Sequence, residues 1–256
     1  LLRDLRLAFG HEQLFLTYQP QIDLASGRIV GVEALLRWRR KDGELIPPDR
    51  FIPVAEQSGL IVGLGGWIVQ TALIALQRFQ APGLPTLRMA VNVSPVQLRQ
   101  PNFLGLIDEA IRQTGTDPAQ LEIEITESVA VGGLDPIVEL LEKIRALGVS
   151  VALDDFGTGY SSLSYLQKLP ADRLKIDRSF VAALENDDQG TRIARTIILL
   201  GRELKLEVIA EGVESQTVAD ALVALGCETA QGYHYARPMP EDEFVEWLAR
   251  RNWQEG

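Results

Sequence analysis

The feature that most constrains the fold is a regular alternation of short, strand-like apolar runs with longer segments that have helical periodicity. Strands that alternate with helices pair in parallel, and the helices cover the outside of the sheet. No Pro/Gly/Ser-rich linker interrupts the alternation, so we expect residues 1–256 to form a single domain. The strand-like runs cover 16–24, 29–38, 87–93, 121–126, 149–154, 173–177, 207–210 and 228–234, and the helical segments cover 61–79, 102–114, 134–147, 161–169, 189–205, 215–226 and 241–251.

Eight strand-like runs in a chain of 256 residues match a TIM-like (β/α)8 barrel of the α/β class. The junction between the first two runs, residues 25–28, departs from this plan because it is too short to hold a crossover helix. We therefore expect the first two strands to form a hairpin, which makes the first strand of the barrel antiparallel. An open, doubly wound sheet is the alternative architecture.

The balance of charges restricts the partners of the chain. Asp and Glu number 35 against 25 Lys and Arg, which gives a formal net charge of −10. Proteins that bind DNA or RNA polymers normally carry a basic excess, so we expect no nucleic-acid polymer as partner. A single cysteine, Cys227, excludes a disulfide within the chain, and only two histidines exclude a His-rich zinc site. These features predict a cytoplasmic domain.

One stretch is long enough to raise the question of a membrane span. Residues 57–77 carry no charged side chain, but they include several glutamines and glycines. We expect a buried core helix here, and neither a membrane span nor a signal peptide within these residues. Since the chain begins with Leu1 and not with Met, we expect it to be a segment of a longer protein, whose flanking regions could be membrane-anchored.

Acidic residues occupy positions where a barrel strand should be apolar. Alternate residues of a barrel strand face the lumen. In residues 121–126 the apolar Leu121, Ile123 and Ile125 alternate with two acids, so Glu122 and Glu124 are expected to face inward. The same alternation, or a position at a strand end, assigns further polar groups to the mouth of the barrel: Glu33, Asn92, Asp154, Asp155, Lys175, Asp177 and Glu211.

Polar groups concentrated at the carboxyl ends of barrel strands lie where such folds place their chemistry. Buried carboxylates are costly unless a cation or hydrogen-bond donors compensate them, although any one of them alone could form a salt bridge or lie in solvent. An oxygen-only donor set suits Mg²⁺ or Mn²⁺, and five carboxylates exceed the charge of one divalent ion, which favours two ions. Two-metal sites typically hydrolyse phosphoryl esters. The expected ligands are Glu33, Asn92, Glu124, Asp154, Asp155 and Glu211.

Two details refine this expectation. Asp154 and Asp155 are consecutive and cannot both face inward in a regular strand, so we expect Asp155 where the strand breaks into Phe156-Gly-Thr-Gly159. Glu122 lies one layer deeper than Glu124, and we interpret it as a structural residue paired with Arg88.

From about residue 5 to residue 250, the chain resembles the EAL-domain cyclic di-GMP phosphodiesterases. Eight motifs, spread in order along the chain, carry the resemblance, which makes it far more specific than one three-letter match. They are Tyr18-Gln-Pro20, Glu33-Ala-Leu35 with Leu36-Arg37-Trp38, Asn92-Val-Ser94, Glu124-Ile-Thr-Glu127, Asp154-Asp-Phe-Gly-Thr-Gly159, Leu174-Lys-Ile-Asp177, Glu211-Gly-Val-Glu214 and Gln231-Gly-Tyr233.

The resemblance implies a TIM-like barrel with an antiparallel first strand. It also implies hydrolysis of one phosphodiester of cyclic di-GMP to linear 5′-pGpG with two Mg²⁺ or Mn²⁺ ions, and inhibition by Ca²⁺. The residues that match the first metal site are Glu33, Asn92, Glu124 and Asp154, and those that match the second are Asp154, Asp155 and Glu211.

The resemblance assigns roles to further residues. Lys175 matches the lysine that hydrogen-bonds the attacking water, and Glu127 matches a glutamate that fixes the loop 155–162, which is coupled to homodimer formation in the family. Glu214 is a supporting residue of the site. The substrate-contacting set comprises Gln19, Leu36, Arg37, Asp177 and Gln231.

Two other functions remain open at this point. A degenerate member of the family could bind cyclic di-GMP without cleaving it, and a barrel could serve only as a scaffold. Degenerate members usually lack the signature glutamate or several metal ligands, whereas every one of these residues is present here. A scaffold would have no reason to bury the acids. The sequence therefore favours the enzyme.

Overall fold

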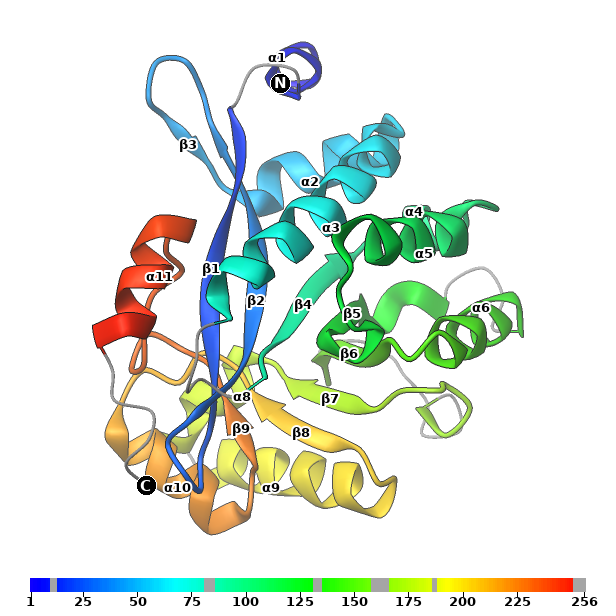
Figure 1. The fold of residues 1–256 in the computed structure, drawn as a ribbon. Helices are drawn as coiled ribbons and strands as arrows, with labels where there is room; N and C mark the ends of the chain where they lie inside the picture. The colour runs from blue at the N-terminus through cyan, green and yellow to red at the C-terminus, as the bar shows by residue number, and fades with distance from the viewer. Residues whose placement is uncertain (10–12, 81–85, 131–134, 158–165, 186–187, 251–256) are drawn as a thin grey trace.

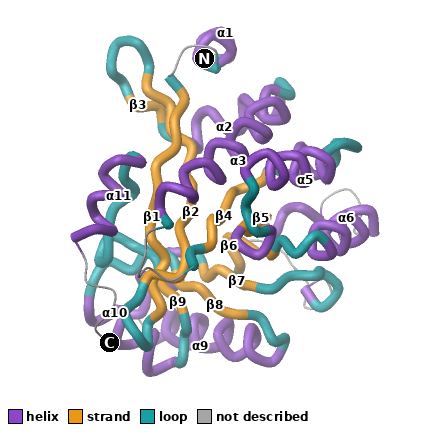
Figure 2. Tube along the Cα trace, in the orientation of Figure 1, coloured by secondary structure: helices purple, strands orange, loops and turns teal. Residues whose placement is uncertain are grey.

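The structure of the protein is a computed structural model, which describes all residues except 10–12, 81–85, 131–134, 158–165, 186–187 and 251–256. Its strands gather in the middle of the molecule and its helices surround them (Figures 1 and 2). The described strands are β1 (Leu14–Asp23), β2 (Ile29–Arg39), β3 (Leu45–Ile46), β4 (Arg88–Val93), β5 (Leu121–Thr126), β6 (Ser150–Phe156), β7 (Arg173–Ile176), β8 (Glu207–Ala210) and β9 (Thr229–Ala230).

The strands form one closed ring. Their order is β1-β9-β8-β7-β6-β5-β4-β2, and a further pairing of β1 with β2 closes it, while β3 only extends β2. Strand β1 is antiparallel to both of its neighbours, and all other pairs around the ring are parallel. The predicted barrel with an antiparallel first strand is confirmed, and the open-sheet alternative is wrong.

The hairpin between β1 and β2 sets the position of two site residues. The Asp23 carboxylate accepts a hydrogen bond of 2.7 Å from the Ser26 backbone N–H, and Gly27 takes a left-handed φ of +68° in the turn. The resulting register places Gln19 directly opposite Glu33. Both side chains therefore reach the same mouth of the barrel.

The helices cover the barrel on its outside (Figure 1). They are α1 (Leu2–Ala8), α2 (Pro48–Gln57), α3 (Leu60–Phe79), α4 (Pro95–Leu98), α5 (Phe103–Thr114), α6 (Asp135–Ala146), α8 (Arg178–Ala182), α9 (Asp188–Glu203), α10 (Gln216–Leu225) and α11 (Glu241–Arg250), with short 3₁₀ turns η1 (Pro118–Gln120), η2 (Glu127–Ala130) and η3 (Ala183–Glu185).

Helix α3 contains the uncharged stretch. By length and composition alone it is the one helix among the described residues that could cross a membrane. In the structure it packs against β4 and α5, and its inward residues Leu64, Leu73 and Phe79 are completely or almost completely buried. The expectation of a core helix is confirmed by this packing.

Some predicted boundaries are wrong. Residues 228–234 were expected to be one strand, but β9 ends at Ala230. The backbone of Gly232 lies so close to Val213 that a Cβ at Gly232 would stand 2.1 Å from the Val213 oxygen, and the chain then turns, with the Tyr235 N–H bonded to the Gly232 carbonyl. Strand β3 and helices α1, α2, α4 and α8 were not predicted, and most of the predicted helix 161–169 lies outside the described residues.

Candidate functional site

The predicted inward acids meet at the carboxyl ends of the parallel strands, around one ammonium group. Lys175 of β7 is completely buried, and its Nζ lies 2.6 Å from a carboxylate oxygen of Glu211 and 2.8 Å from one of Glu124. Asp154 and Glu33 follow at 3.4 and 3.7 Å. Four carboxylates, three from strands β2, β5 and β6 and one directly after β8, thus surround one cation, which compensates only part of their charge. We call these five residues the carboxylate centre.

The pKa values of the centre reflect this imbalance. Burial raises the pKa of Glu124 well above its usual value, and the neighbouring carboxylates raise it further against the opposing effect of Lys175. Burial likewise raises the pKa of Glu211 to about 8. Burial alone would lower the pKa of Lys175, but the surrounding acids outweigh it and raise that pKa well above its usual value. The ammonium therefore stays charged, and some of the acids hold protons near neutral pH.

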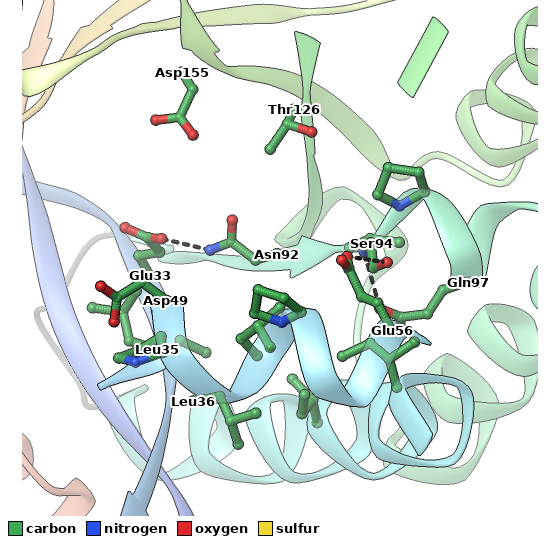
Figure 3. Close-up of a pocket in the computed structure, with 18 of the residues that line it drawn as sticks. Glu33, Leu35, Leu36, Asp49, Glu56, Asn92, Ser94, Gln97, Thr126 and Asp155 are labelled. Atoms are coloured by element: carbon green, nitrogen blue, oxygen red, sulfur yellow. Dashed lines mark hydrogen bonds between the residues drawn. The ribbon is translucent and has the colours of Figure 1, made fainter. Parts of the chain in front are cut away.

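Glu33 is oriented by amide groups. The Asn92 Nδ2 donates a hydrogen bond of 2.7 Å to one oxygen of Glu33 (Figure 3). The Gln231 amide donates to the other oxygen. The same Gln231 amide donates to Gln19 at 2.9 Å, and Gln19 donates to the carbonyl of Ala236 at 3.0 Å. Burial raises the pKa of Glu33, but Lys175 and these donors outweigh it, so the pKa is lowered overall. Glu33 is therefore ionised near neutral pH.

The two consecutive aspartates separate as the sequence predicts. The pairing of β6 with β7 loses its register between Leu153 and Phe156, and Asp155 takes a left-handed φ of +54° there. The Asp155 N–H donates to the Asp154 carboxylate at 2.9 Å. One ligand atom each from Asp154, Asp155 and Glu211 lies within 4.8 Å of the other two. The strand break thus presents adjacent carboxylates to one small volume.

The residues present fit divalent cations. Both oxygens of Glu124 are buried, and the Lys175 ammonium at 2.8 Å is shared with three other carboxylates. A buried carboxylate without donors is costly unless a cation compensates it. The donors are oxygens of carboxylates and one amide, which suits Mg²⁺ or Mn²⁺. Of the predicted ligands, Asp154, Asp155 and Glu211 bring ligand atoms close enough together to hold an ion. Glu33 and Glu124 lie beside them, around the Lys175 ammonium.

A second acid lies one layer deeper in the barrel. Glu122 is completely buried, and its Oε2 lies 2.8 Å from the guanidinium of Arg173 but 3.7 Å from that of Arg88. Arg173 also pairs with Glu207 at 2.7 Å. Arg88 was the predicted partner, yet Arg173 makes the closer contact, because it also faces inward from β7, two strands along the ring from β5. Glu122 is a structural residue beneath the site.

Two cavities open on either side of the end of β2, and both are lined by Glu33, Leu35 and Arg37. The larger, of about 600 Å³, lies over α2 and α4 and is lined mainly by apolar groups such as Ile52, Ile61 and Val93; we call it the apolar lobe (Figure 3). The smaller, of about 280 Å³, is lined mainly by polar side chains, and we call it the polar lobe. Its lining includes Gln19, Asp154, Arg178, Glu211, Glu214, Gln231 and Tyr233. An elongated ligand that filled both lobes would cross the carboxylate centre.

Comparison with known proteins assigns the family. The family model of the EAL domain matches residues 2–238. The chain belongs to the EAL domain family. It is 41% identical over 249 residues to the bifunctional diguanylate cyclase/cyclic di-GMP phosphodiesterase MucR of Pseudomonas aeruginosa, and 41% identical over 245 residues to the cyclic di-GMP phosphodiesterase NbdA of the same organism.

These matches cover 97% and 96% of the chain but only 36% and 31% of the two relatives. The EAL domain therefore spans about a third of the length of these relatives. Among solved structures, a PaMucR phosphodiesterase in complex with c-di-GMP superposes with a TM-score of 0.90 at 41% identity, and the match covers 95% of this chain and 98% of that one.

The remaining predicted residues of the EAL domain lie around the centre. Arg37 is half-buried and lines both lobes, and its guanidinium donates to the Leu36 carbonyl at 3.0 Å; Leu36 lines the apolar lobe.

Asp177 follows β7 and caps α8, where its carboxylate accepts a hydrogen bond of 3.0 Å from the Ser179 N–H. Glu127 accepts one of 3.2 Å from the Gly157 N–H, and Glu214 is exposed at the edge of the polar lobe. Most of the loop 155–162 lies outside the described residues.

The sequence analysis missed a network that supports Asn92. Two residues after Asn92, the Ser94 hydroxyl donates to Glu56 of α2 at 2.6 Å, and the Ser94 N–H donates to Gln97 at 3.0 Å (Figure 3). A Cβ on Gly65 would lie 1.8 Å from the amide nitrogen of Gln97. The absence of a side chain at Gly65 therefore leaves room for Gln97. The Ser-x-x-Gln spacing after Asn92 is a helix-capping signal that could have predicted the start of α4 and the contact between Ser94 and Gln97. No sequence pattern indicated the role of Glu56, because its contact with Ser94 joins two elements that are 38 residues apart in the chain.

We expect divalent metal binding to release protons. Carboxyl groups must be deprotonated to coordinate a metal, and the pKa values of Glu124 and Glu211 are raised in the metal-free protein. Affinity for Mn²⁺ should therefore rise as the pH approaches about 8, the pKa of Glu211. Calorimetric titration in buffers of different ionisation enthalpy measures the protons released. Binding that is independent of buffer and pH would contradict the assignment.

Proposed function

We propose that this EAL domain hydrolyses one phosphodiester bond of cyclic di-GMP to linear 5′-pGpG, with two Mg²⁺ or Mn²⁺ ions bound at the carboxylate centre. The observation that carries the proposal is the convergence of Glu33, Glu124, Asp154 and Glu211 on Lys175, whose single positive charge compensates only part of theirs. The names of MucR and NbdA support it, because both relatives are called cyclic di-GMP phosphodiesterases. The activity of the longer protein is part of the same proposal.

Glu33, Asn92, Glu124 and Asp154 would hold the first ion, and Asp154, Asp155 and Glu211 the second. When bound, such ions would lower the pKa of a water and polarise the phosphoryl oxygens of the substrate. Asp154 belongs to both sets, which agrees with its place beside Asp155 and Glu211 in one compact group of ligand atoms. The hydrogen bonds from Asn92 and Gln231 orient Glu33 toward the lumen before the substrate arrives.

Lys175 would hydrogen-bond the attacking water. The acids around the Lys175 ammonium keep it protonated across the neutral range, so it donates hydrogen bonds and is no general base. A buried cation next to the reacting atoms also offsets the negative charge that develops in the transition state. The side chain therefore has two roles, and in the resting protein it balances the charge of the centre.

The substrate would lie across the mouth of the barrel with its two halves in the two lobes. Arg37 lines both lobes and can bind a phosphate with its planar guanidinium. Gln19 and Gln231 line the polar lobe and Leu36 the apolar lobe, and these residues, with Asp177, would contact the substrate. Glu214 would support the site from the edge of the polar lobe. Cyclic di-GMP is an anion, but two cations in the centre would make the acidic mouth locally positive.

One assay tests the proposal directly. The purified domain is incubated with cyclic di-GMP and Mn²⁺ or Mg²⁺, and the products are separated by chromatography. We expect pGpG with either ion, and no product in EDTA or in Ca²⁺. Calorimetry in Ca²⁺ measures binding without turnover. Binding without any hydrolysis in Mn²⁺ and Mg²⁺ would show a receptor and overturn the enzymatic assignment.

We also propose that the domain forms a two-fold homodimer through the region that follows Asp155. The Glu127–Gly157 hydrogen bond ties the end of β5 to the first residues of that region, so the dimer contact could influence Asp155 and the second metal site. Dilution should therefore lower both the dimer fraction and the specific activity, as measured by analytical ultracentrifugation and by turnover. A monomer at all concentrations with full activity would refute the coupling.

The proposed place of action is the cytoplasm. The proposal rests on the expected substrate, a bacterial second messenger, and on a lone, buried cysteine, which needs no oxidising compartment. Fractionation of cells that express the protein from its own gene, with the domain detected by antibody and by protease protection, tests it. Digestion of the domain by protease added outside intact cells would contradict it.

A further inference from the structure

Arg178 lies at the site but has no role in the mechanism described above. It follows Asp177 directly, two residues after the end of β7, and it lines the polar lobe together with Arg37 and Glu211. Its side chain is exposed, and within the described residues it forms no ion pair or hydrogen bond through its guanidinium. An unpaired guanidinium in the wall of a cavity is available to a ligand.

The backbone fixes the direction from which Arg178 enters the cavity. Gly212, next to Glu211, has a left-handed φ of +69°, and a Cβ on it would lie 2.5 Å from the Cβ of Arg178. The absence of a side chain at Gly212 therefore lets the stem of Arg178 lie against the turn that presents Glu211. Because this contact involves the backbone and the first side-chain carbon, only the outer part of Arg178 is free to move.

Arg178 and Arg37 approach the site from opposite walls. In the ring β1-β9-β8-β7-β6-β5-β4-β2, closed by the pairing of β1 with β2, β7 and β2 are separated by three strands on either side. Arg37 belongs to β2, and Arg178 follows β7. The carboxylate centre lies between the two walls. Two guanidinium groups across a cavity match a ligand that carries two separated negative charges.

The proposed substrate carries its charge in that way. A cyclic dinucleotide has two phosphodiesters on opposite sides of one ring, and only one of them can lie over the carboxylate centre at a time. The reacting phosphate needs the metal ligands and Lys175, which is completely buried in the lumen. The second phosphate must then lie farther out, at the level of the exposed rim, where Arg178 is found.

We propose that Arg178 is a substrate-contacting residue that binds the phosphodiester of the cyclic dinucleotide that is not being cleaved. The inference rests on the proposed function and extends it, because it gives the polar lobe a specific task. It explains why a cation would be retained at an exposed position beside Glu211 and Glu214. It also predicts that substrates with two phosphates are favoured over substrates with one.

The test compares two substrates in Mn²⁺. For cyclic di-GMP, Arg178→Ala should raise KM by roughly 10-fold or more, the effect of losing a charge-assisted hydrogen bond, and the loss should appear in KM more than in kcat. Bis(4-nitrophenyl) phosphate has a single phosphodiester. For this substrate, Arg178→Ala should reduce kcat/KM roughly 10-fold less than it does for cyclic di-GMP. Arg178→Lys should recover part of the affinity, since lysine keeps the positive charge but lacks the planar guanidinium that binds two phosphate oxygens at once.

The matched control is Arg112→Ala. Arg112 is an exposed arginine of α5 that pairs with Asp108 and Glu109, so the variant makes the same change in net charge away from both lobes. An unchanged KM in Arg178→Ala, or an equal loss for both substrates, would overturn the proposal. The second result would mean that Arg178 acts on the reacting phosphate or on the fold.

Equilibrium binding separates this proposal from the proposed function. Calorimetry with cyclic di-GMP in Ca²⁺ should show weaker binding to Arg178→Ala than to the wild type and to Arg112→Ala. If the wild type binds cyclic di-GMP but does not hydrolyse it, the enzymatic assignment fails, and the binding comparison still decides the role of Arg178. Equal affinities of the wild type and Arg178→Ala would overturn that role.

Discussion

Replacement of Glu33 by alanine should abolish hydrolysis of cyclic di-GMP in Mg²⁺ or Mn²⁺ while the barrel remains folded. Glu33 is the acid of the centre whose pKa is lowered, and it receives hydrogen bonds from Asn92 and Gln231, so its charge is in place before a metal binds. Loss of a metal ligand should lower kcat by roughly 10³-fold or more, at or beyond the upper end of what removal of one transition-state donor costs.

The fold should survive because three carboxylates remain within 4 Å of Lys175 and the rest of the barrel is unchanged. We expect a modest fall of the melting temperature in EDTA, because the Asn92 and Gln231 amides lose their acceptor. Glu139→Ala is the matched control, since Glu139 is an exposed acid of α6 that pairs with Lys143. Full hydrolysis by Glu33→Ala would contradict the assignment of Glu33 as a metal ligand. A large loss of stability in EDTA would mean that Glu33 is needed for folding.

The second large effect is expected for Lys175→Met. If Lys175 orients the attacking water, its loss removes an interaction made mainly in the transition state. Affinity for cyclic di-GMP in Ca²⁺ should then stay within a few-fold of wild type, whereas turnover in Mg²⁺ should fall by roughly 10²–10³-fold. Calorimetry and chromatography measure the two quantities. Normal turnover would remove Lys175 from the reaction.

The alternative role of Lys175 is to balance charge, and it has a separate signature. Lys175 lies within 4 Å of four carboxylates, and without it their pKa values should rise further. Acids with a raised pKa keep protons that the unfolded chain releases, so the stability of the variant in EDTA should fall as the pH rises above about 4.5. Lys143→Met, at the exposed pair with Glu139, is the control. A parallel loss of affinity and turnover would favour charge balance alone.

Much of the fold could be predicted from local pattern. The alternation of strand-like and helical periods indicated the barrel, and the short junction 25–28 indicated the reversed first strand, because four residues cannot cross over a sheet. The period of two within strands placed Glu122 and Glu124 in the lumen, where both are buried. The adjacent aspartates predicted the break at Asp155, where the left-handed φ is found.

What the sequence determined by itself, therefore, is which side chains face the lumen and at which end of the strands they lie, because both follow from the local backbone period. Which of these side chains meet was decided by the tertiary structure. Glu122 pairs with Arg173, 51 residues away, more closely than with Arg88, and Lys175 meets acids from three other strands and from the residue after β8. The apolar lobe over α2 and the place of Arg178 opposite Arg37 were likewise not predictable. The physical reason is that contacts across a barrel depend on closure of the ring, strand order and side-chain reach, none of which a local period encodes.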